Sequence, residues 1–163
     1  MSTELVILIG IQAAGKSTFF RTHFADTHEH VSKDRIRNNR NRTRQQTQLI
    51  EAALQAGKLV VVDNTNATVE ARAPLISLGR MYGAQIVGYY FEPQLKESLE
   101  RNKQREGKAR VPDVAIFVTL KKLVRPSYAE GFDKLFSVHA TENAGFEVRE
   151  WAEAESAGED SPS

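Results

Sequence analysis

The chain contains 163 residues, which is enough for one domain with a single sizeable core. Its composition is that of an ordinary globular protein, with 40% hydrophobic and 26% charged residues. The absence of cysteine excludes a disulfide framework, a thiolate zinc site and a cysteine nucleophile. The first apolar run, residues 5–9, is too short for a signal sequence or a membrane span, so we expect a cytoplasmic protein that does not enter a membrane.

Charge is distributed unevenly along the chain. The whole chain has 22 basic and 21 acidic residues, but residues 142–163 contain seven acids and one base. Residues 1–141 therefore carry 21 bases and 14 acids, a net charge of +7. A basic body favours a polyanionic partner over a neutral metabolite, the alternative being a plain solvated surface. We expect residues 1–141 to form the folded domain, and residues 142–163 to form an edge strand to about residue 151 and then an acidic flexible tail.

Apolar periodicity predicts strands and helices that alternate along the chain. In chain order these are a strand at 5–9, a helix at 16–24, a strand at 28–32, a helix at 34–56, a strand at 59–62, a helix at 69–82, a strand at 85–91, helices at 94–105 and 114–124, a strand at 135–139 and an edge strand at 146–151. Gly57 is expected to end the long helix, and Pro74 to sit in the first turn of its helix or to kink it. The alternation indicates an α/β fold with a mainly parallel sheet and helices on both faces.

A glycine-rich loop follows the first strand. Residues 10–17 read GIQAAGKS and fit the pattern G-x-x-x-x-G-K-[ST] at every fixed position, between a buried strand and a helix. Gly10 and Gly15 allow a tight turn whose N–H groups face a phosphate, and the helix N-terminus adds positive charge. Lys16 is expected to reach the β- and γ-phosphates and Ser17 to ligate Mg²⁺. The pattern therefore predicts ATP binding with Mg²⁺, the alternative being a chance glycine-rich turn.

Two carboxylates follow strands at the edge of the sheet where ligands bind in parallel α/β folds. Asp63 ends the strand at 59–62 and is expected to face the phosphates or the Mg²⁺ shell, the alternative being an Asx turn into the next helix. Asp34 follows the strand at 28–32 and could take the proton of an acceptor hydroxyl during in-line attack. It is equally well placed to be the N-cap of the following helix, and the residues alone leave both roles open.

Arginines gather in two segments. Residues 33–44 read KDRIRNNRNRTR, and on a helix Arg37, Arg40 and Arg44 would share one face with a spacing suited to phosphates. Arg101 and Arg105 precede the loop 106–111, where a lid helix could bring positive charge to the transferred phosphoryl group. Solvated helix faces are the alternative for both segments.

Two histidines, His28 and His30, alternate in the second predicted strand and therefore lie on one face of it. A zinc pair is one interpretation. No third ligand is apparent in the sequence, which favours solvated or core histidines instead.

Five segments form a wider pattern: GIQAAGKSTFF, VSKD, VVVDNTN, RNKQREGKARVP and AEGFD. In this order, from about residue 5 to about residue 139, they resemble the 5′-hydroxyl polynucleotide kinase family. The P-loop pattern is shared by many families, whereas the D-N-T-N segment and the R-x-x-x-R lid followed by V-P are much narrower. The resemblance implies a P-loop NTPase three-layer fold with a helical lid.

The resemblance also implies roles for single residues. Asp34 would be the general base for the 5′-hydroxyl, Arg37 would hold the acceptor phosphate, and Arg105 would grip the donor phosphates with Arg101 beside it. Thr65 would lie close to the acceptor. The predicted catalytic residues are Asp34, Lys16 and Arg105; the predicted ATP-binding residues are Gly10, Ala13, Ala14, Gly15, Lys16, Ser17, Thr18, Arg101 and Arg105; the predicted acceptor-binding residues are Arg37, Arg40, Arg44, Asp63, Thr65 and Asn66; the predicted metal ligand is Ser17, with Asp63 added through a water.

The chain departs from the family pattern in two respects. Gln12 and Ala13 stand where the family often has Pro and usually has Gly, so the nucleotide loop is expected to be slightly altered but functional. The sequence also includes no counterpart of the phosphatase domain that many members carry, so end-healing by this chain alone is not expected.

We therefore predict an ATP- and Mg²⁺-dependent kinase that transfers the γ-phosphoryl group to the 5′-hydroxyl end of DNA or RNA. One alternative is a kinase of small-metabolite or antibiotic hydroxyls, because related small-molecule kinases share the scaffold. The other alternative is a non-catalytic ATP-binding switch that signals through a partner protein.

Overall fold

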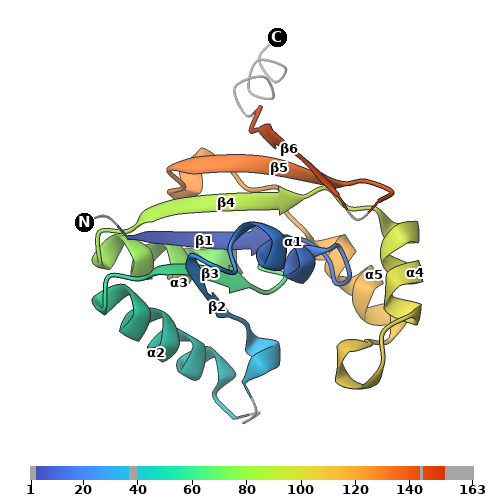
Figure 1. Ribbon diagram of the computed structural model, residues 1–163, viewed down its shortest axis with the longest axis horizontal. Coiled ribbons are helices and arrows are strands. Elements are labelled where there is room, and N and C mark those ends of the chain that lie inside the picture. The colour runs from blue at the N-terminus through green and yellow to red at the C-terminus, as the bar shows by residue number, and fades with distance from the viewer. Residues whose placement is uncertain (1–2, 37–39, 144, 153–163) are drawn as a thin grey trace.

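A six-stranded sheet forms the centre of the computed structural model, which describes residues 3–36, 40–143 and 145–152. The strand order is β2-β3-β1-β4-β5-β6, and the first five strands are parallel while β6 runs antiparallel to β5 (Figure 1). The strands are β1 (Glu4–Ile9), β2 (His28–Val31), β3 (Leu59–Asp63), β4 (Gln85–Phe91), β5 (Lys134–Ala140) and β6 (Phe146–Glu150). The predicted α/β fold with a mainly parallel sheet is thereby confirmed.

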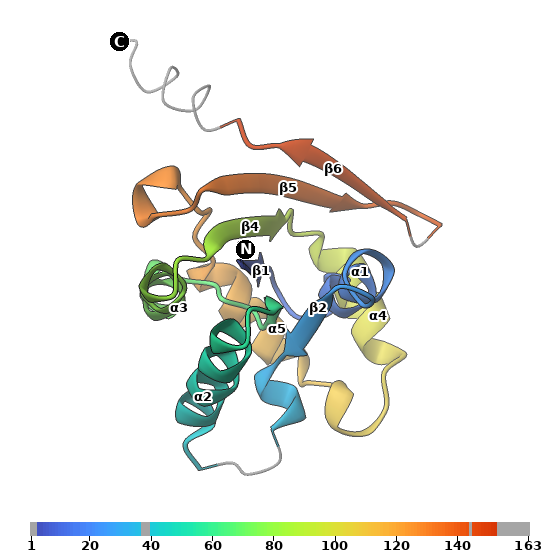
Figure 2. The ribbon, with the colours of Figure 1, turned by 60° about the vertical axis from the view of Figure 1, so that its left-hand side comes forward.

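Helices cover both faces of the sheet because the central strands are apolar on both sides (Figure 2). Along β1, Leu5, Ile7 and Ile9 face one core cluster, whereas Val6 and Leu8 face the other. The first cluster is covered by α2 and α3, and the second by α1, α4 and α5. These helices are α1 (Lys16–His23), α2 (Arg42–Gln55), α3 (Val69–Met81), α4 (Leu95–Lys103) and α5 (Asp113–Lys122), with short 3₁₀ turns η1 (Lys33–Arg35), η2 (Gly107–Ala109) and η3 (Tyr128–Glu130).

The long helix predicted at 34–56 is wrong in its first part. The chain forms η1 at Lys33–Arg35, and α2 begins only at Arg42, after Asn41 in the left-handed region at φ 57°. Asn tolerates that conformation, which cannot be part of a right-handed helix, so α2 starts after Asn41. Arg40 therefore lies in a turn ahead of α2 rather than on a helical stripe with Arg44, and Arg37 lies outside the described residues.

Two further details bear on the predictions. Gly57, at φ 75°, follows the end of α2 as expected of a left-handed helix stop. Pro74 lies inside α3, beyond its first turn, so the first-turn placement was wrong.

Among the described residues, no helix combines the length and the apolar composition needed to cross a membrane. The predicted acidic tail falls mostly on residues 153–163, outside the described residues.

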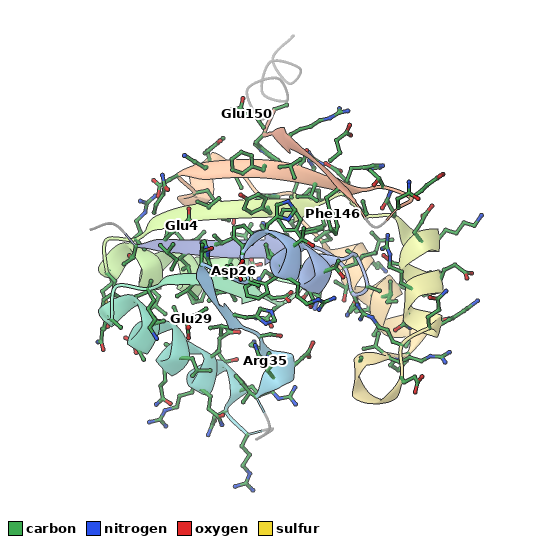
Figure 3. The ribbon with its side chains drawn as sticks, viewed as in Figure 1. Glu4, Asp26, Glu29, Arg35, Phe146 and Glu150 are labelled. Carbon is green, nitrogen blue, oxygen red and sulfur yellow. The ribbon has the colours of Figure 1, made fainter. Side chains whose placement is uncertain are left out.

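The β5–β6 hairpin brings a C-terminal residue onto the phosphate-loop side of the sheet. Phe146, labelled in Figure 3, packs edge-on against Phe19 of α1, with ring centroids 5.1 Å apart. A Cβ added at Gly15 would lie 3.1 Å from the Phe146 ring, so a larger residue at position 15 would crowd this contact. The outermost strand thus packs against the start of α1, where the glycine-rich loop ends.

Candidate active site

The glycine-rich loop joins β1 to α1 at the carboxyl end of the sheet. Ala13 and Gly15 both have positive φ, 60° and 99°, and Gly15 is the N-cap of α1. A Cβ at Gly10 would lie 3.0 Å from the Cβ of Phe91, so only glycine fits there without a shift. The Gly10 N–H donates to the Thr65 carbonyl at 3.0 Å, which ties the loop to the segment after β3. This is the turn that the P-loop pattern predicts.

Lys16 lies inside this loop rather than at the surface. Its side chain is buried, and Nζ donates to the carbonyls of Gly10 at 2.9 Å and Ile11 at 2.7 Å. Burial is the main cause that lowers the pKa of Lys16, to about 8; Arg105 lowers it further, while Asp63 and Asp34 act to raise it. The Lys16 side chain is therefore fixed against the loop, and its amine is less basic than that of an exposed lysine.

Ser17 and Asp63 meet at the same edge. Ser17 Oγ donates to Asp63 Oδ2 at 2.8 Å, although the two residues are 46 positions apart. Burial opposes ionisation of Asp63, but hydrogen bonds from His30 and Ser17 and the charge of Lys16 outweigh it and lower the pKa. A hydroxyl and an ionised carboxylate are hard oxygen ligands, and Mg²⁺ is usually held by one or two such groups plus substrate phosphates. The donor set therefore fits Mg²⁺.

Asp34 lies in η1 and its carboxylate is available for chemistry. Ser32, not Asp34, is the N-cap of this turn, because its hydroxyl accepts the Asp34 N–H at 3.3 Å. The N-cap role that the sequence left open for Asp34 therefore belongs to Ser32. Asp34 itself is exposed and lines the space in front of the phosphate loop.

One cavity of about 340 Å³ brings all three predicted catalytic residues together. It is lined by Gln12, Ala13, Lys16, Ser17, Ser32, Lys33, Asp34, Arg42, Asp63, Asn64, Thr65, Arg105, Ala109 and Val111. A second, larger cavity of about 830 Å³ shares Ser17, Asp34 and Arg105 with it. It adds Gly15, Thr18, Arg21 and Arg101 from the donor side. Five segments that are distant in sequence thus converge at one site.

The lid consists of α4 and the loop 104–112. Arg101 Nη1 donates to the Ala13 carbonyl at 2.8 Å, so α4 is already bound to the phosphate loop. The buried Asn102 side chain holds the far end of the lid, donating to the Val111 carbonyl at 2.7 Å and accepting its N–H at 3.0 Å. Between these ties, Arg105 Nη1 donates to the Ala109 carbonyl at 3.4 Å, a long hydrogen bond.

Four of the predicted acceptor residues, Arg40 among them, lie apart from this cavity or outside the description. Asn66 is buried, and its Nδ2 donates to the Leu8 carbonyl at 2.7 Å, so its amide holds the loop to β1. Arg44 is exposed on α2, and Arg37 lies outside the described residues. Roles for these residues toward an acceptor stay predictions.

Sequence reasoning missed several residues that line the cavity, among them Lys33, Arg42 and Asn64. Asn64 connects three elements: its Oδ1 accepts the Lys33 N–H at 2.9 Å, and its Nδ2 donates to Gln46 Oε1 at 2.6 Å. The sequence could have indicated Asn64 as a site residue, because it lies inside the D-N-T-N segment. Arg42 was passed over because the helical stripe predicted for this segment did not include it.

The two histidines of β2 bond to different carboxylates. His28 Nε2 lies 2.7 Å from Glu4 Oε1, and His30 Nε2 lies 2.8 Å from Asp63 Oδ2. Within the part of the chain that the structure describes, no three His, Asp or Glu side chains gather as metal ligands. The pair is thus two separate histidine–carboxylate contacts.

Known proteins share both sequence and fold with this chain. Over 144 residues it is 27% identical to the bifunctional polynucleotide phosphatase/kinase of Schizosaccharomyces pombe, an alignment covering 83% of this chain and 33% of the relative. The chain spans about a third of the length of the curated relatives that it matches.

Solved structures extend the comparison to the fold. A fungal RNA kinase superimposes with a TM-score of 0.65 at 15% identity, over 85% of this chain and 38% of that one. A gluconokinase from Sinorhizobium meliloti 1021 does so with a TM-score of 0.62 at 16% identity, over 85% of this chain and 83% of that one. At such identities the likeness shows the fold alone, and it confirms the P-loop α/β fold.

The family comparison covers most of the described body. The AAA_33 family, described as an AAA domain, matches residues 5–126, from the first residues of β1 to the segment after α5. The chain therefore belongs to the AAA_33 family of AAA domains.

Proposed function

We propose that this chain is an ATP-dependent kinase that transfers the γ-phosphoryl group to the 5′-hydroxyl end of a nucleic acid. One observation carries the proposal. Lys16 and Ser17 of the phosphate loop line the same cavity as the exposed carboxylate of Asp34. Phosphoryl transfer needs a phosphate-binding group and a base for the acceptor on opposite sides of one space. The curated relative named for polynucleotide kinase activity supports the same acceptor.

On the donor side, the proposed roles follow from position. The loop N–H groups and Lys16 bind the β- and γ-phosphates, and Thr18, Arg101 and Arg105 bind the rest of the donor phosphates. Mg²⁺, held by Ser17 and reached by Asp63 through a water, would supply positive charge to the phosphate oxygens. Arg105, weakly tied within the lid, moves toward the transferred group when the lid closes.

On the acceptor side, Asp34 takes the proton of the 5′-hydroxyl as its oxygen attacks the γ-phosphorus. The new O–P bond forms while the bond from the γ-phosphorus to the bridging oxygen breaks, and ADP leaves. Thr65, Lys33 and Arg42 line the same cavity and position the acceptor nucleotide. Arg40 and Arg44 supply positive charge for the following phosphates, and Arg37 is assigned the same role from the sequence alone. We assign this kinase domain to residues 1–141, and residues 142–163 to an edge strand to about residue 151 and the acidic tail.

A kinase of small-molecule hydroxyls is the rival function, and the shared fold with a gluconokinase is what favours it. The two functions differ in their dependence on salt. An oligonucleotide acceptor releases counterions on binding, so its apparent affinity falls steeply from 50 to 200 mM salt, whereas a neutral sugar shows little change.

The test is a transfer assay with γ-labelled ATP and Mg²⁺. The acceptors are 5′-hydroxyl DNA and RNA oligonucleotides, nucleoside 3′-monophosphates, sugars and aminoglycosides, and the matched control is the same oligonucleotide already phosphorylated at its 5′ end. Label on the 5′-hydroxyl oligonucleotide and not on its phosphorylated twin supports the proposal and ranks DNA against RNA. Label confined to a small molecule would overturn the acceptor, and no label with ATP still bound would favour a non-catalytic switch.

A further inference from the structure

The carboxylate of Asp63 is held by two neighbours, only one of which belongs to the phosphate loop. Its Oδ2 accepts hydrogen bonds from Ser17 Oγ at 2.8 Å and from His30 Nε2 at 2.8 Å. Asp63 is 5% exposed, so these two contacts lie in an environment with little competing water. The orientation of the carboxylate therefore depends on His30 as much as on Ser17.

The His30 ring is itself held on two sides. The Arg35 guanidinium donates from Nη1 to His30 Nδ1 at 3.0 Å, which makes Nδ1 the acceptor and leaves the ring proton on Nε2. The opposite tautomer would have no proton to donate to Asp63. Phe20 of α1 stacks on the ring with centroids 4.1 Å apart and an interplanar angle of 19°. Arg35, labelled in Figure 3, reaches this ring from η1, the turn that also carries Asp34.

We propose that His30 is a positioning residue for the Mg²⁺ site, which acts by holding the Asp63 carboxylate in the orientation that receives the Ser17 hydroxyl and the metal shell. The inference rests on the Mg²⁺-nucleotide part of the proposed function and not on the identity of the acceptor. Groups that orient the ligands or neighbours of a metal commonly change its affinity by about 10- to 100-fold when they are removed. Arg35 then serves the same end, because it selects the tautomer of His30.

The same strand offers a matched control. His28 also lies in β2, and its Nε2 contacts a carboxylate, Glu4, at 2.7 Å. That pair is remote from the phosphate loop, since Glu4 begins β1 and Ser17 lies in α1 beyond the end of that strand. A histidine that only stabilises the sheet should behave in the same way at both positions. A positioning residue should affect Mg²⁺ only at position 30.

The experiment measures equilibrium binding of a fluorescent ADP analogue to the full chain, first in EDTA and then across a Mg²⁺ titration, with no acceptor present. His30→Phe keeps a ring for Phe20 to stack on but removes the N–H donor. We expect it to raise the Mg²⁺ concentration at half-maximal binding about tenfold, with EDTA binding unchanged. His30→Gln, which keeps an N–H donor, should recover part of the loss, and His28→Phe should behave like wild type.

Arg35→Met gives a second route that does not alter the ring. Arg35 is exposed, so this variant is expected to fold. ¹⁵N NMR should show a weaker preference of the His30 ring for the Nε2–H tautomer, which the contact with Asp63 still favours, while the Mg²⁺ midpoint rises. An unchanged Mg²⁺ midpoint in His30→Phe, with both histidine variants losing only thermal stability, would overturn the proposal. Absence of Mg²⁺-dependent binding in wild type would overturn the donor chemistry itself, whereas a failed acceptor assay with Mg²⁺ binding intact would affect only the acceptor.

Discussion

The donor side and the acceptor side of the cavity are built differently. On the donor side, Lys16 and Asp63 are 8% and 5% exposed, and each makes two hydrogen bonds within the site. On the acceptor side, Asp34 is exposed, and Lys33 and Thr65 are only partly buried. The donor side is thus held in place by the fold, whereas the acceptor side depends on a bound substrate to order it.

This difference explains why donor chemistry is easier to infer than acceptor chemistry. Binding a triphosphate requires a fixed backbone turn, and a fixed turn has a sequence pattern. Recognising an acceptor requires exposed side chains on separate segments, and their pattern varies with the acceptor. The predictions below test whether the two sides respond differently to substitution.

The largest effect is expected from the buried arginine that holds the segment after β3. Arg72 is fully buried; it pairs with Glu130 at 2.9 and 3.0 Å and donates to the Asn66 carbonyl at 3.0 Å. Arg72→Met leaves Glu130 buried without its partner and should lower the free energy of unfolding by about 3–5 kcal/mol. Denaturant unfolding measures the loss.

A surface pair supplies the control for Arg72. Arg80 and Asp133 lie 3.2 Å apart but are 48% and 34% exposed, so Arg80→Met should cost at most about 1 kcal/mol. Equal losses for Arg72→Met and Arg80→Met would show that the donor side is not held by this buried pair.

The next effect concerns the lid. Arg105→Ala should lower kcat by about 10²-fold, because the arginine contributes its charge mainly in the transition state. The unfolding free energy should stay close to wild type, since the hydrogen bond from Arg105 to the Ala109 carbonyl is long, at 3.4 Å. Pre-steady-state transfer kinetics provide the check, with Lys103→Ala, an exposed α4 residue, as the control. A kcat that Arg105→Ala leaves unaltered would remove Arg105 from the mechanism.

Sequence alone predicted the turn between β1 and α1 and the strand before it well, and for a local reason. The P-loop spacing and the strand that ends at Asp63 depend on neighbours in sequence, and both lie where expected. The contact between His30 and Asp63 joins residues 33 positions apart, and no local pattern marks it. The helix start was misplaced because α2 begins only after Asn41, and no local pattern marks the left-handed conformation of that residue. Long-range pairing and single backbone conformations are therefore what sequence reasoning missed.

The third prediction concerns pH. Because the pKa of Lys16 in the free protein is lowered to about 8, kcat/KM for ATP should fall as pH rises through about 8 and the ammonium loses its proton. The free energy of unfolding should change in the opposite direction. Between about pH 8 and the ordinary pKa of lysine, Lys16 is protonated more in the unfolded chain than in the folded one. The contribution of Lys16 to the free energy of unfolding therefore increases as pH rises through this range. Lys16→Arg should remove the downturn, and a downturn that persists would assign it elsewhere.

The smallest effect tests the strain in the phosphate loop. Ala13 has φ 60°, a conformation that costs a residue with a Cβ about 1–2 kcal/mol. Ala13→Gly removes this cost but gives the unfolded chain more freedom. The net effect should be a rise in the unfolding free energy of about 0.5–1 kcal/mol. Its neighbour Ala14 is buried like Ala13 but has no positive φ, so Ala14→Gly relieves no strain and should destabilise instead. Thermal unfolding of both variants distinguishes strain from a general effect of glycine.

The most direct test of the two-sided site is Asp34→Asn. The substitution preserves the size of the side chain and removes its ability to take a proton. We expect Mg²⁺-ATP binding equal to wild type, because the donor side does not use Asp34, and a fall in single-turnover transfer of about 10²- to 10⁴-fold. Transfer at the wild-type rate would contradict the account, since the acceptor hydroxyl would then be deprotonated by another group.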